Sequence, residues 1–168
     1  MKRVIFMGAL AIAKLVLKKD AWYYFSSGAQ DEISMRENHN AYHRIWLRPR
    51  VMMDVSKVNT TTRLLGAKVA MPLYISATAM TKLAHPDAEK LLTRIAGRCN
   101  IIQMIPTLSS CSLDDIVNAR MHPDQAQWFQ LYVDTDRQIT QQIVKQVEAK
   151  GIQGLFITVD LATVGMYL

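Results

Sequence analysis

Four short apolar runs recur along the chain from residue 73 onward, and polar stretches separate them. The runs are rich in β-branched and aromatic residues, which favour strands, and they cover residues 73–76, 101–105, 128–133 and 155–159. The stretches between them show the apolar spacing of helices. Strands that alternate with helices about every 25 to 30 residues indicate β/α units around a parallel sheet.

Local signals mark the ends of these predicted helices. Pro86 suits a first helical turn, because proline has no N–H to lose there. Ser112 and Asp115 have the spacing of a capping box. Gly151 follows the helical stretch 139–150 and predicts a stop.

The first twenty residues allow two interpretations. A run of about ten apolar residues follows Lys2 and Arg3, which is too short to span a membrane, because a spanning helix needs ~20. The run resembles part of a targeting segment. It also fits an amphipathic helix with Leu10, Ala13 and Leu17 on one face, and we favour this helix.

The next fifty residues are less regular. Ser27 and Gly28 interrupt two helical stretches, and Asp31 is a candidate cap for the second. Between residues 47 and 69 a proline and Gly66 break the pattern, so we expect short strands and loops there.

Composition and charge exclude some classes of function. Half of the residues are apolar and a fifth are charged, as in folded domains. The net charge of +6 is scattered rather than gathered on a helix face, so we expect no nucleic-acid partner. Cys99 and Cys111 lie in no metal-type spacing, so we expect no metal site. No glycine-rich phosphate loop follows the first strand, which argues against the commonest nucleotide-binding open sheets.

Polar or small residues gather where each predicted strand ends. They are Ala77, Thr78 and Ala79 after the first run, Thr107 and Ser109 after the second, Gln130 and Tyr132 in the third, and Thr158 and Asp160 in the fourth. Parallel barrels have their catalytic groups at these carboxyl ends, and residues two apart on a strand share a face. Threonine and tyrosine are also good strand formers, and Asp160 could simply cap the next segment. An unpaired amide or carboxylate beside apolar strands costs on the order of a few kcal/mol, so a site is the better explanation for Gln130 and Asp160.

Several longer motifs occur in order along the chain. They are YYFSSGAQDE at 23–32, REN at 36–38, RPR at 48–50, SATAM at 76–80, AHP at 84–86, TLSS at 107–110, FQLYV at 129–133 and TVD at 158–160. Together they resemble the FMN-dependent α-hydroxy-acid dehydrogenases, which include glycolate oxidase and the L-lactate:cytochrome c oxidoreductases. The likeness covers residues 21–165, whereas residues 1–20 and 166–168 diverge.

The resemblance implies an α/β fold of the (β/α)8 TIM-barrel family. The chain would supply a truncated half-barrel of about four β/α units preceded by N-terminal helices, as a single partial domain over residues 1–168. The cofactor of this family is FMN, which carries the redox chemistry. By similarity, Ala77, Thr78 and Ala79 present backbone to the flavin, and its polar edge bonds to Ser109, Gln130 and Thr158.

The resemblance also assigns substrate-binding and catalytic residues. Tyr24 matches the tyrosine that binds the carboxylate of an L-2-hydroxy acid. Without this match, packing of an aromatic stripe with Trp22, Tyr23 and Phe25 against the barrel would be the preferred interpretation. Tyr132 matches the tyrosine near the substrate hydroxyl. Asp160 matches the aspartate that orients the imidazole of the catalytic histidine.

The departures from the family define the remaining expectations. The catalytic histidine and the phosphate-binding loops have no counterpart in this chain, and Tyr167 stands where a substrate-facing arginine is expected. We therefore expect the N-terminal half only, inactive alone, of an oxidoreductase for L-lactate. The alternative is a non-catalytic barrel fragment that associates with itself or with an intact homologue.

Partners and compartment follow from the same likeness. Cytochrome c or oxygen would accept the electrons, and the intact family would form homo-oligomers. The compartment would be the mitochondrial intermembrane space or the cytoplasm, with no membrane span.

Overall fold

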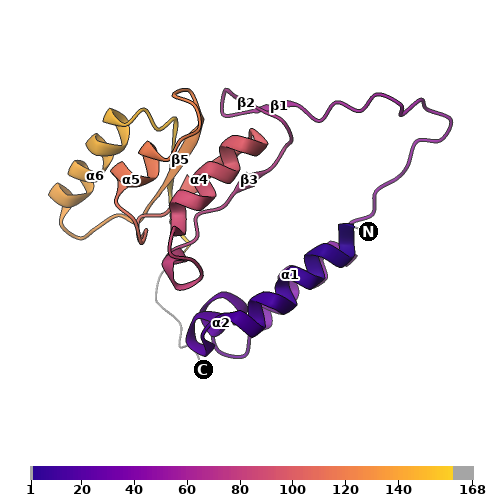
Figure 1. The fold of residues 1–168 in the computed structure, drawn as a ribbon, viewed down its shortest axis with the longest axis horizontal. Helices are drawn as coiled ribbons and strands as arrows, with labels where there is room; N and C mark the ends of the chain where they lie inside the picture. The colour runs from indigo at the N-terminus through magenta and orange to yellow at the C-terminus, as the bar shows by residue number, and fades with distance from the viewer. Residues whose placement is uncertain (1, 161–168) are drawn as a thin grey trace. The chain divides into compact units, whose positions relative to one another are not determined.

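Three helices come first in the computed structural model, which describes residues 2–160. They are α1 (Lys2–Val16), α2 (Lys19–Ser26) and α3 (Ile33–His43), drawn in indigo and purple in Figure 1. They belong to a unit that includes residues 2–57, and residues 58–160 form a second unit. The expected N-terminal helix is present, but it ends at Val16, so Leu17 lies outside it. No helix in the part of the chain that the structure describes is both long and apolar enough to cross a membrane.

Two of the predicted helix starts are wrong. The residue before α3 is Glu32 rather than Asp31, and its φ of 56° places it in the left-handed region. Its carboxylate caps no N–H of α3 and instead accepts the N–H of Gly28 at 3.0 Å. Helix α4 begins at Ala88, with Asp87 before it, so Pro86 lies outside the first turn.

A short hairpin opens the second unit. Strands β1 (Thr62–Leu64) and β2 (Ala67–Val69) pair antiparallel, as expected for short strands in this region. The turn residues Leu65 and Gly66 both have positive φ, 44° and 82°. Two positive φ values are the requirement of a type I′ turn, which glycine meets without strain.

The predicted parallel sheet is confirmed. Its strands are β3 (Tyr74–Ile75), β4 (Ile102–Ile105), β5 (Gln127–Leu131) and β6 (Gly154–Ile157), hydrogen-bonded in that order. The short 3-10 helix η1 (Thr81–Leu83) and α4 (Ala88–Cys99) follow β3, α5 (Leu113–Asn118) follows β4, and α6 (Arg137–Ala149) follows β5. Among the described residues the sheet is not closed, since β3 and β6 lie at its edges.

The helices cover the outer face of this sheet (Figure 1). The buried apolar side chains of this layer are Ile105, Ile116, Phe129, Leu131 and Val147. The predicted helix ends here are confirmed: the hydroxyl of Ser112 accepts the N–H of Asp115 at 3.1 Å, and Gly151 has a φ of +66°. The helix-end residues and the buried apolar side chains therefore define the same β/α units.

The inner face of the sheet has its own apolar layer. Trp128 packs between Tyr74 and Phe156, with ring centroids 5.1 Å and 4.9 Å away. A Cβ on Gly154 would lie 2.6 Å from the indole, so only glycine fits there. Gln130 and Tyr132 come two and four residues after Trp128, and Thr158 and Asp160 come two and four residues after Phe156.

Candidate functional site

The carboxyl ends of the four parallel strands surround one pocket of about 350 Å³. It is lined by Ala77, Ala79, Pro106, Gln130, Tyr132, Thr158 and Asp160. Its volume falls within the usual range of small-molecule pockets, roughly 300 to 1,000 Å³. Six of these seven residues were predicted from the sequence. A second hollow of about 340 Å³ lies beside β2 and the end of α4, and none of the predicted residues lines it.

Gln130 is the best-anchored side chain of the pocket. It is 9% exposed, its Nε2 donates to the hydroxyl of Thr158 at 2.8 Å, and its Oε1 accepts the N–H of Thr107 at 3.2 Å. An amide has two N–H donors and two lone pairs on its oxygen. Gln130 therefore retains one donor and one acceptor for a ligand.

Thr107 joins two strands beside Gln130. Its hydroxyl donates to the carbonyl of Gln130 at 2.6 Å and accepts the N–H of Tyr132 at 2.9 Å. These bonds tie the loop after β4 to the end of β5. Thr107 was noticed as a polar residue at a strand end, but its bridging role depends on the register of two strands and could not be read from the sequence.

The small and hydroxyl residues of the predicted cofactor site do not all reach the pocket. Ala77 and Ala79 line it, and their short side chains allow a flat ring to approach the backbone. Thr78 is exposed, and its hydroxyl donates to the carbonyl of Ser76 at 3.4 Å. The hydroxyl of Ser109 donates to the carbonyl of Cys111 at 3.0 Å. The roles of Thr78 and Ser109 at a flavin stay predictions.

The predicted catalytic side chains both line the pocket. Tyr132 is 39% exposed and Asp160 is exposed. Within residues 2–160 neither side chain forms a hydrogen bond to protein, so both are free to bind a ligand. Their spacing from Gln130 and Thr158 places them at the outer rim.

Tyr24 belongs to the other unit. It lies in α2, is 42% exposed, and packs edge-to-face against Phe25 with ring centroids 5.0 Å apart. This contact lies within α2. Its role at a substrate carboxylate stays a prediction.

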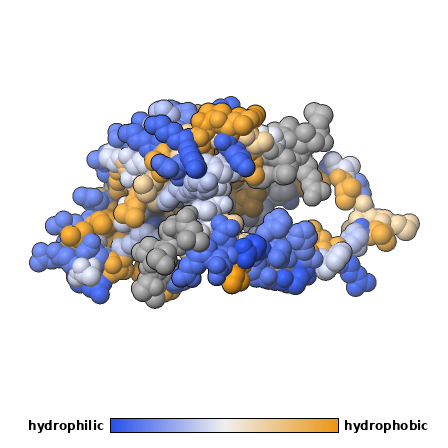
Figure 2. Space-filling view, turned by 90° about the horizontal axis from the view of Figure 1, so that it is seen from below, coloured by the Kyte–Doolittle hydropathy of each residue, from blue (hydrophilic) through white to orange (hydrophobic). Residues whose placement is uncertain are grey.

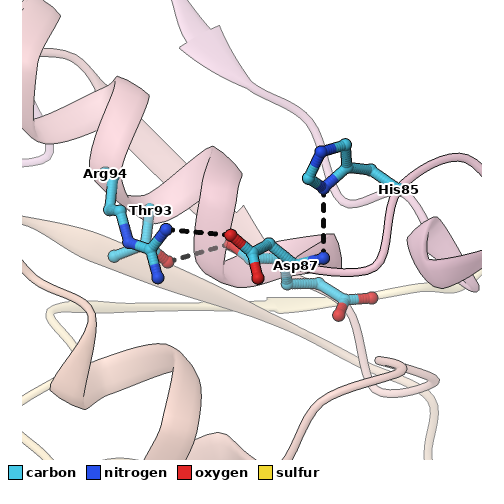
Figure 3. A network of polar contacts seen from close by, with 5 residues as sticks. His85, Asp87, Thr93 and Arg94 are labelled. Atoms are coloured by element: carbon cyan, nitrogen blue, oxygen red, sulfur yellow. Dashed lines mark hydrogen bonds and ion pairs between the residues drawn. The ribbon is translucent and has the colours of Figure 1, made fainter.

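Sequence reasoning missed a group of polar contacts at the start of α4. Arg94 donates to the carboxylate of Asp87 at 3.0 Å, and the N–H of Asp87 donates to Nδ1 of His85 at 3.1 Å (Figure 3). Beside them Glu89 is fully buried. Glu89 lies on the same helix face as the buried Thr93 and Ala96, and a carboxylate on an apolar face is the signal that could have identified it.

The residues present fit one edge of FMN. The pocket combines two alanines, an amide with a free donor and a free acceptor, and the hydroxyl of Thr158. The pyrimidine edge of a flavin has both donors and acceptors, and an amide can match both. The described residues thus suit the isoalloxazine ring of the cofactor.

Comparisons with known proteins show the family of the chain. The profile of the FMN-dependent dehydrogenase family matches residues 13–167. The L-lactate dehydrogenase (cytochrome) of Wickerhamomyces anomalus is 49% identical, and the match covers 92% of this chain and 27% of that relative. Glycolate oxidase 1 of Zea mays is 39% identical, with 92% of this chain and 41% of that relative covered. The chain thus spans less than half of the length of these relatives.

Solved structures show the same likeness. The flavin-binding domain of baker's yeast flavocytochrome b2 is 48% identical, with a TM-score of 0.90 over 94% of this chain and 41% of that one. A mandelate oxidase with (S)-mandelic acid is 28% identical, with a TM-score of 0.88 over 95% of this chain and 47% of that one. The chain therefore belongs to the FMN-dependent dehydrogenase family, whose cofactor is FMN, and its parallel β/α units are part of the TIM barrel of that family.

Proposed function

We propose that this chain is the amino-terminal part of an enzyme that oxidises an L-2-hydroxy acid, with L-lactate as the leading candidate, to the 2-oxo acid. The observation that carries the proposal is the pocket where Gln130, Tyr132, Thr158 and Asp160 meet at the carboxyl ends of parallel strands. FMN, when bound, would accept the two electrons of the oxidation.

The protein side of the cofactor site would position the flavin. Ala77 and Ala79 would allow the ring to lie against the backbone, with Thr78 between them. Gln130 and Thr158 would bond to its polar edge, since Gln130 keeps one free N–H and one free lone pair. Ser109, on the loop after β4, would add a hydroxyl to the same edge.

The substrate would lie at the rim of the pocket. The hydroxyl of Tyr132 would bond to the substrate hydroxyl, and Tyr24 would bind its carboxylate. Asp160 would orient the imidazole of the family's catalytic histidine and stabilise the cation that forms when the imidazole takes the substrate proton. The carboxylate of Asp160 has no protein partner among residues 2–160, which suits a role toward a group outside them.

The electron acceptor is proposed from the identities of the relatives. Two enzymes named L-lactate dehydrogenase (cytochrome) are 48 and 49% identical to the chain, and the glycolate oxidase of Zea mays is 39% identical. A cytochrome is therefore a better candidate than oxygen. With cytochrome c as acceptor, the mitochondrial intermembrane space would be the compartment.

A second candidate function is association without catalysis. Strands β3 and β6 lie at the edges of the described sheet, and Leu155, Ile157 and Val159 are exposed in and after β6. Figure 2 shows exposed apolar residues, in orange, between hydrophilic ones on one face of the molecule. Unpaired strand edges favour pairing with another chain, either a second copy or an intact homologue.

One assay distinguishes the two functions. The purified chain is mixed with FMN, an electron acceptor and L-lactate, with D-lactate as control, before and after addition of the carboxyl-terminal part of the Wickerhamomyces anomalus enzyme. We expect acceptor reduction with L-lactate only, and only when both parts are present. Association of the two parts without any reduction would favour the non-catalytic function.

A further inference from the structure

Glu89 is a charged side chain in a fully buried position. It is the second residue of α4, its exposed fraction is 0%, and no ion pair within residues 2–160 includes it. A buried carboxylate without a cation needs hydrogen-bond donors, because an unpaired buried charge is strongly unfavourable. The groups that donate hydrogen bonds to the Glu89 carboxylate therefore indicate its role.

Both carboxylate oxygens accept backbone N–H groups from the loop after β4. Oε1 accepts the N–H of Ser110 at 2.8 Å, and Oε2 accepts the N–H of Cys111 at 3.1 Å. Hydrogen bonds to an ionised acceptor are about twice as strong as neutral ones. The position in the first turn of a 12-residue helix also favours a negative charge.

The surroundings keep this carboxylate ionised. Burial by itself would raise the pKa of Glu89, but the N–H of Ser110 and the nearby Thr81 and Cys111 outweigh burial, so the pKa lies below its ordinary value. Thr81 Oγ1 is itself buried and has no well-aligned hydrogen bond within the described residues. Ala88 has a φ of 45°, an unfavourable backbone conformation for alanine directly before Glu89.

The loop that Glu89 binds covers residues 107–111 and begins directly after Pro106, which lines the pocket. At one end Thr107 bonds to Gln130 and to the N–H of Tyr132. At the other end the hydroxyl of Ser110 accepts the N–H of Lys82 at 3.2 Å. The 107–111 loop thus connects Glu89 to η1 and to the ends of β4 and β5.

We propose that Glu89 is a positioning residue of the flavin site, whose buried carboxylate binds two successive N–H groups and so fixes the 107–111 loop against the pocket. Its effect on flavin rests on the function proposed above, whereas its effect on the loop does not. Glu89 does not line the pocket and would act through Thr107 and Ser109.

The first test measures the loop without flavin. Glu89→Gln keeps the shape of the side chain but turns an N–H₂ group toward a backbone donor. Asp87→Asn is the matched control, because it removes another carboxylate one residue before α4, on the Arg94 side (Figure 3). We expect amide hydrogen exchange in residues 107–111 to rise at least tenfold in Glu89→Gln and to stay unchanged in Asp87→Asn. Unchanged exchange in Glu89→Gln would overturn the proposal.

The second test measures FMN affinity by fluorescence quenching. It compares the Kd of each variant with that of the wild-type chain, so the test works even where binding is weak. We expect Glu89→Gln to weaken FMN binding about tenfold. The double variant Glu89→Gln, Ser109→Ala should lose less affinity than the product of the two single losses, because both residues act through one loop. Multiplicative effects would remove Glu89 from the flavin site. If Glu89→Gln does not fold, Glu89→Asp, which keeps the charge but shortens the reach, is judged by the same two measurements.

A wild-type chain that binds no FMN at any concentration would overturn the proposed function and the flavin part of this inference together. The exchange experiment would still decide whether Glu89 fixes the loop. The two failures are thus distinguishable.

Discussion

Strand β5 carries a glutamine on each of its faces, and the two side chains are bonded differently. Gln127 faces the helices and is 0% exposed; its Nε2 donates to Gln103 at 3.0 Å and its Oε1 accepts from Arg120 at 2.7 Å. Gln130 faces the pocket and has bonding capacity left. The same residue type thus supports the fold on one face and offers a ligand site on the other.

The outer face contains a buried polar network. Gln103 bonds to the hydroxyl of Thr93 at 2.6 Å and to the carbonyl of Glu89 at 3.1 Å, so α4 is joined to β4 and β5 through side chains. Burial lowers the pKa of Arg120. A network of this kind is costly to interrupt, because the remaining members stay buried without partners.

The largest expected effect on stability is therefore on the outer face. Gln127→Leu should lower the free energy of unfolding by about 2 to 4 kcal/mol, because Arg120 and Gln103 each lose a buried partner. Urea denaturation measures the change. FMN affinity of the folded fraction should not change. If Gln127→Leu weakened FMN binding and left the free energy of unfolding unchanged, the outer face would serve the ligand rather than the fold.

The next effect is on catalysis, measured with both parts of the barrel present. Asp160→Asn should lower kcat about a hundredfold, because a poorly oriented proton acceptor loses most of its contribution. KM and the free energy of unfolding should change little, since Asp160 is exposed. Full activity in this variant would remove Asp160 from the mechanism.

Gln130→Leu should act mainly on cofactor binding. Loss of a neutral hydrogen bond to the flavin ring should weaken FMN binding about tenfold. Because Thr107 and Thr158 each lose a hydrogen-bond partner, the free energy of unfolding should fall by about 1 kcal/mol. A titration of FMN fluorescence and urea denaturation give the two values. A greater loss of stability than in Gln127→Leu would show that both faces serve only the fold.

The smallest effect concerns pH. The folded-state pKa of Glu89 lies below its ordinary value near 4.5, so its ionised form stabilises the fold above that pH. This stabilisation should be lost as the pH falls through the lower, folded-state pKa. Urea denaturation between about pH 3 and 6 measures it, and Glu89→Gln should show a flatter pH dependence. An identical pH profile in the two proteins would mean that the pKa of Glu89 does not differ between the folded and the unfolded chain.

The sequence predicted the elements of the second unit and much of the pocket. Period-two spacing on β5 and β6 placed Gln130, Tyr132, Thr158 and Asp160 together, because strand geometry fixes which residues share a face. The order of strands and the parallel sheet followed from the alternation of apolar runs with capped helices.

Contacts between distant segments could not be predicted in this way. Glu89 binds N–H groups 21 and 22 residues further along the chain, and the bond between Gln103 and Gln127 requires the register of β4 with β5. Asp31 failed as a cap because a left-handed turn at Glu32 moved the helix start by one residue. Such turns depend on the path of the whole loop rather than on one capping residue.

We propose that the inner face of this sheet forms one part of a flavin and hydroxy-acid site. The most direct measurement is a titration of FMN followed by addition of L-lactate, with flavin fluorescence and absorbance recorded for the 168-residue chain alone and with the carboxyl-terminal part of the Wickerhamomyces anomalus enzyme. The chain alone should bind FMN weakly and show no bleaching, because the resemblance predicts that the family's phosphate-binding loops and catalytic histidine lie outside these 168 residues. Both parts together should bind FMN tightly and bleach with L-lactate. Tight binding and bleaching by the chain alone, or none with both parts, would contradict the claim.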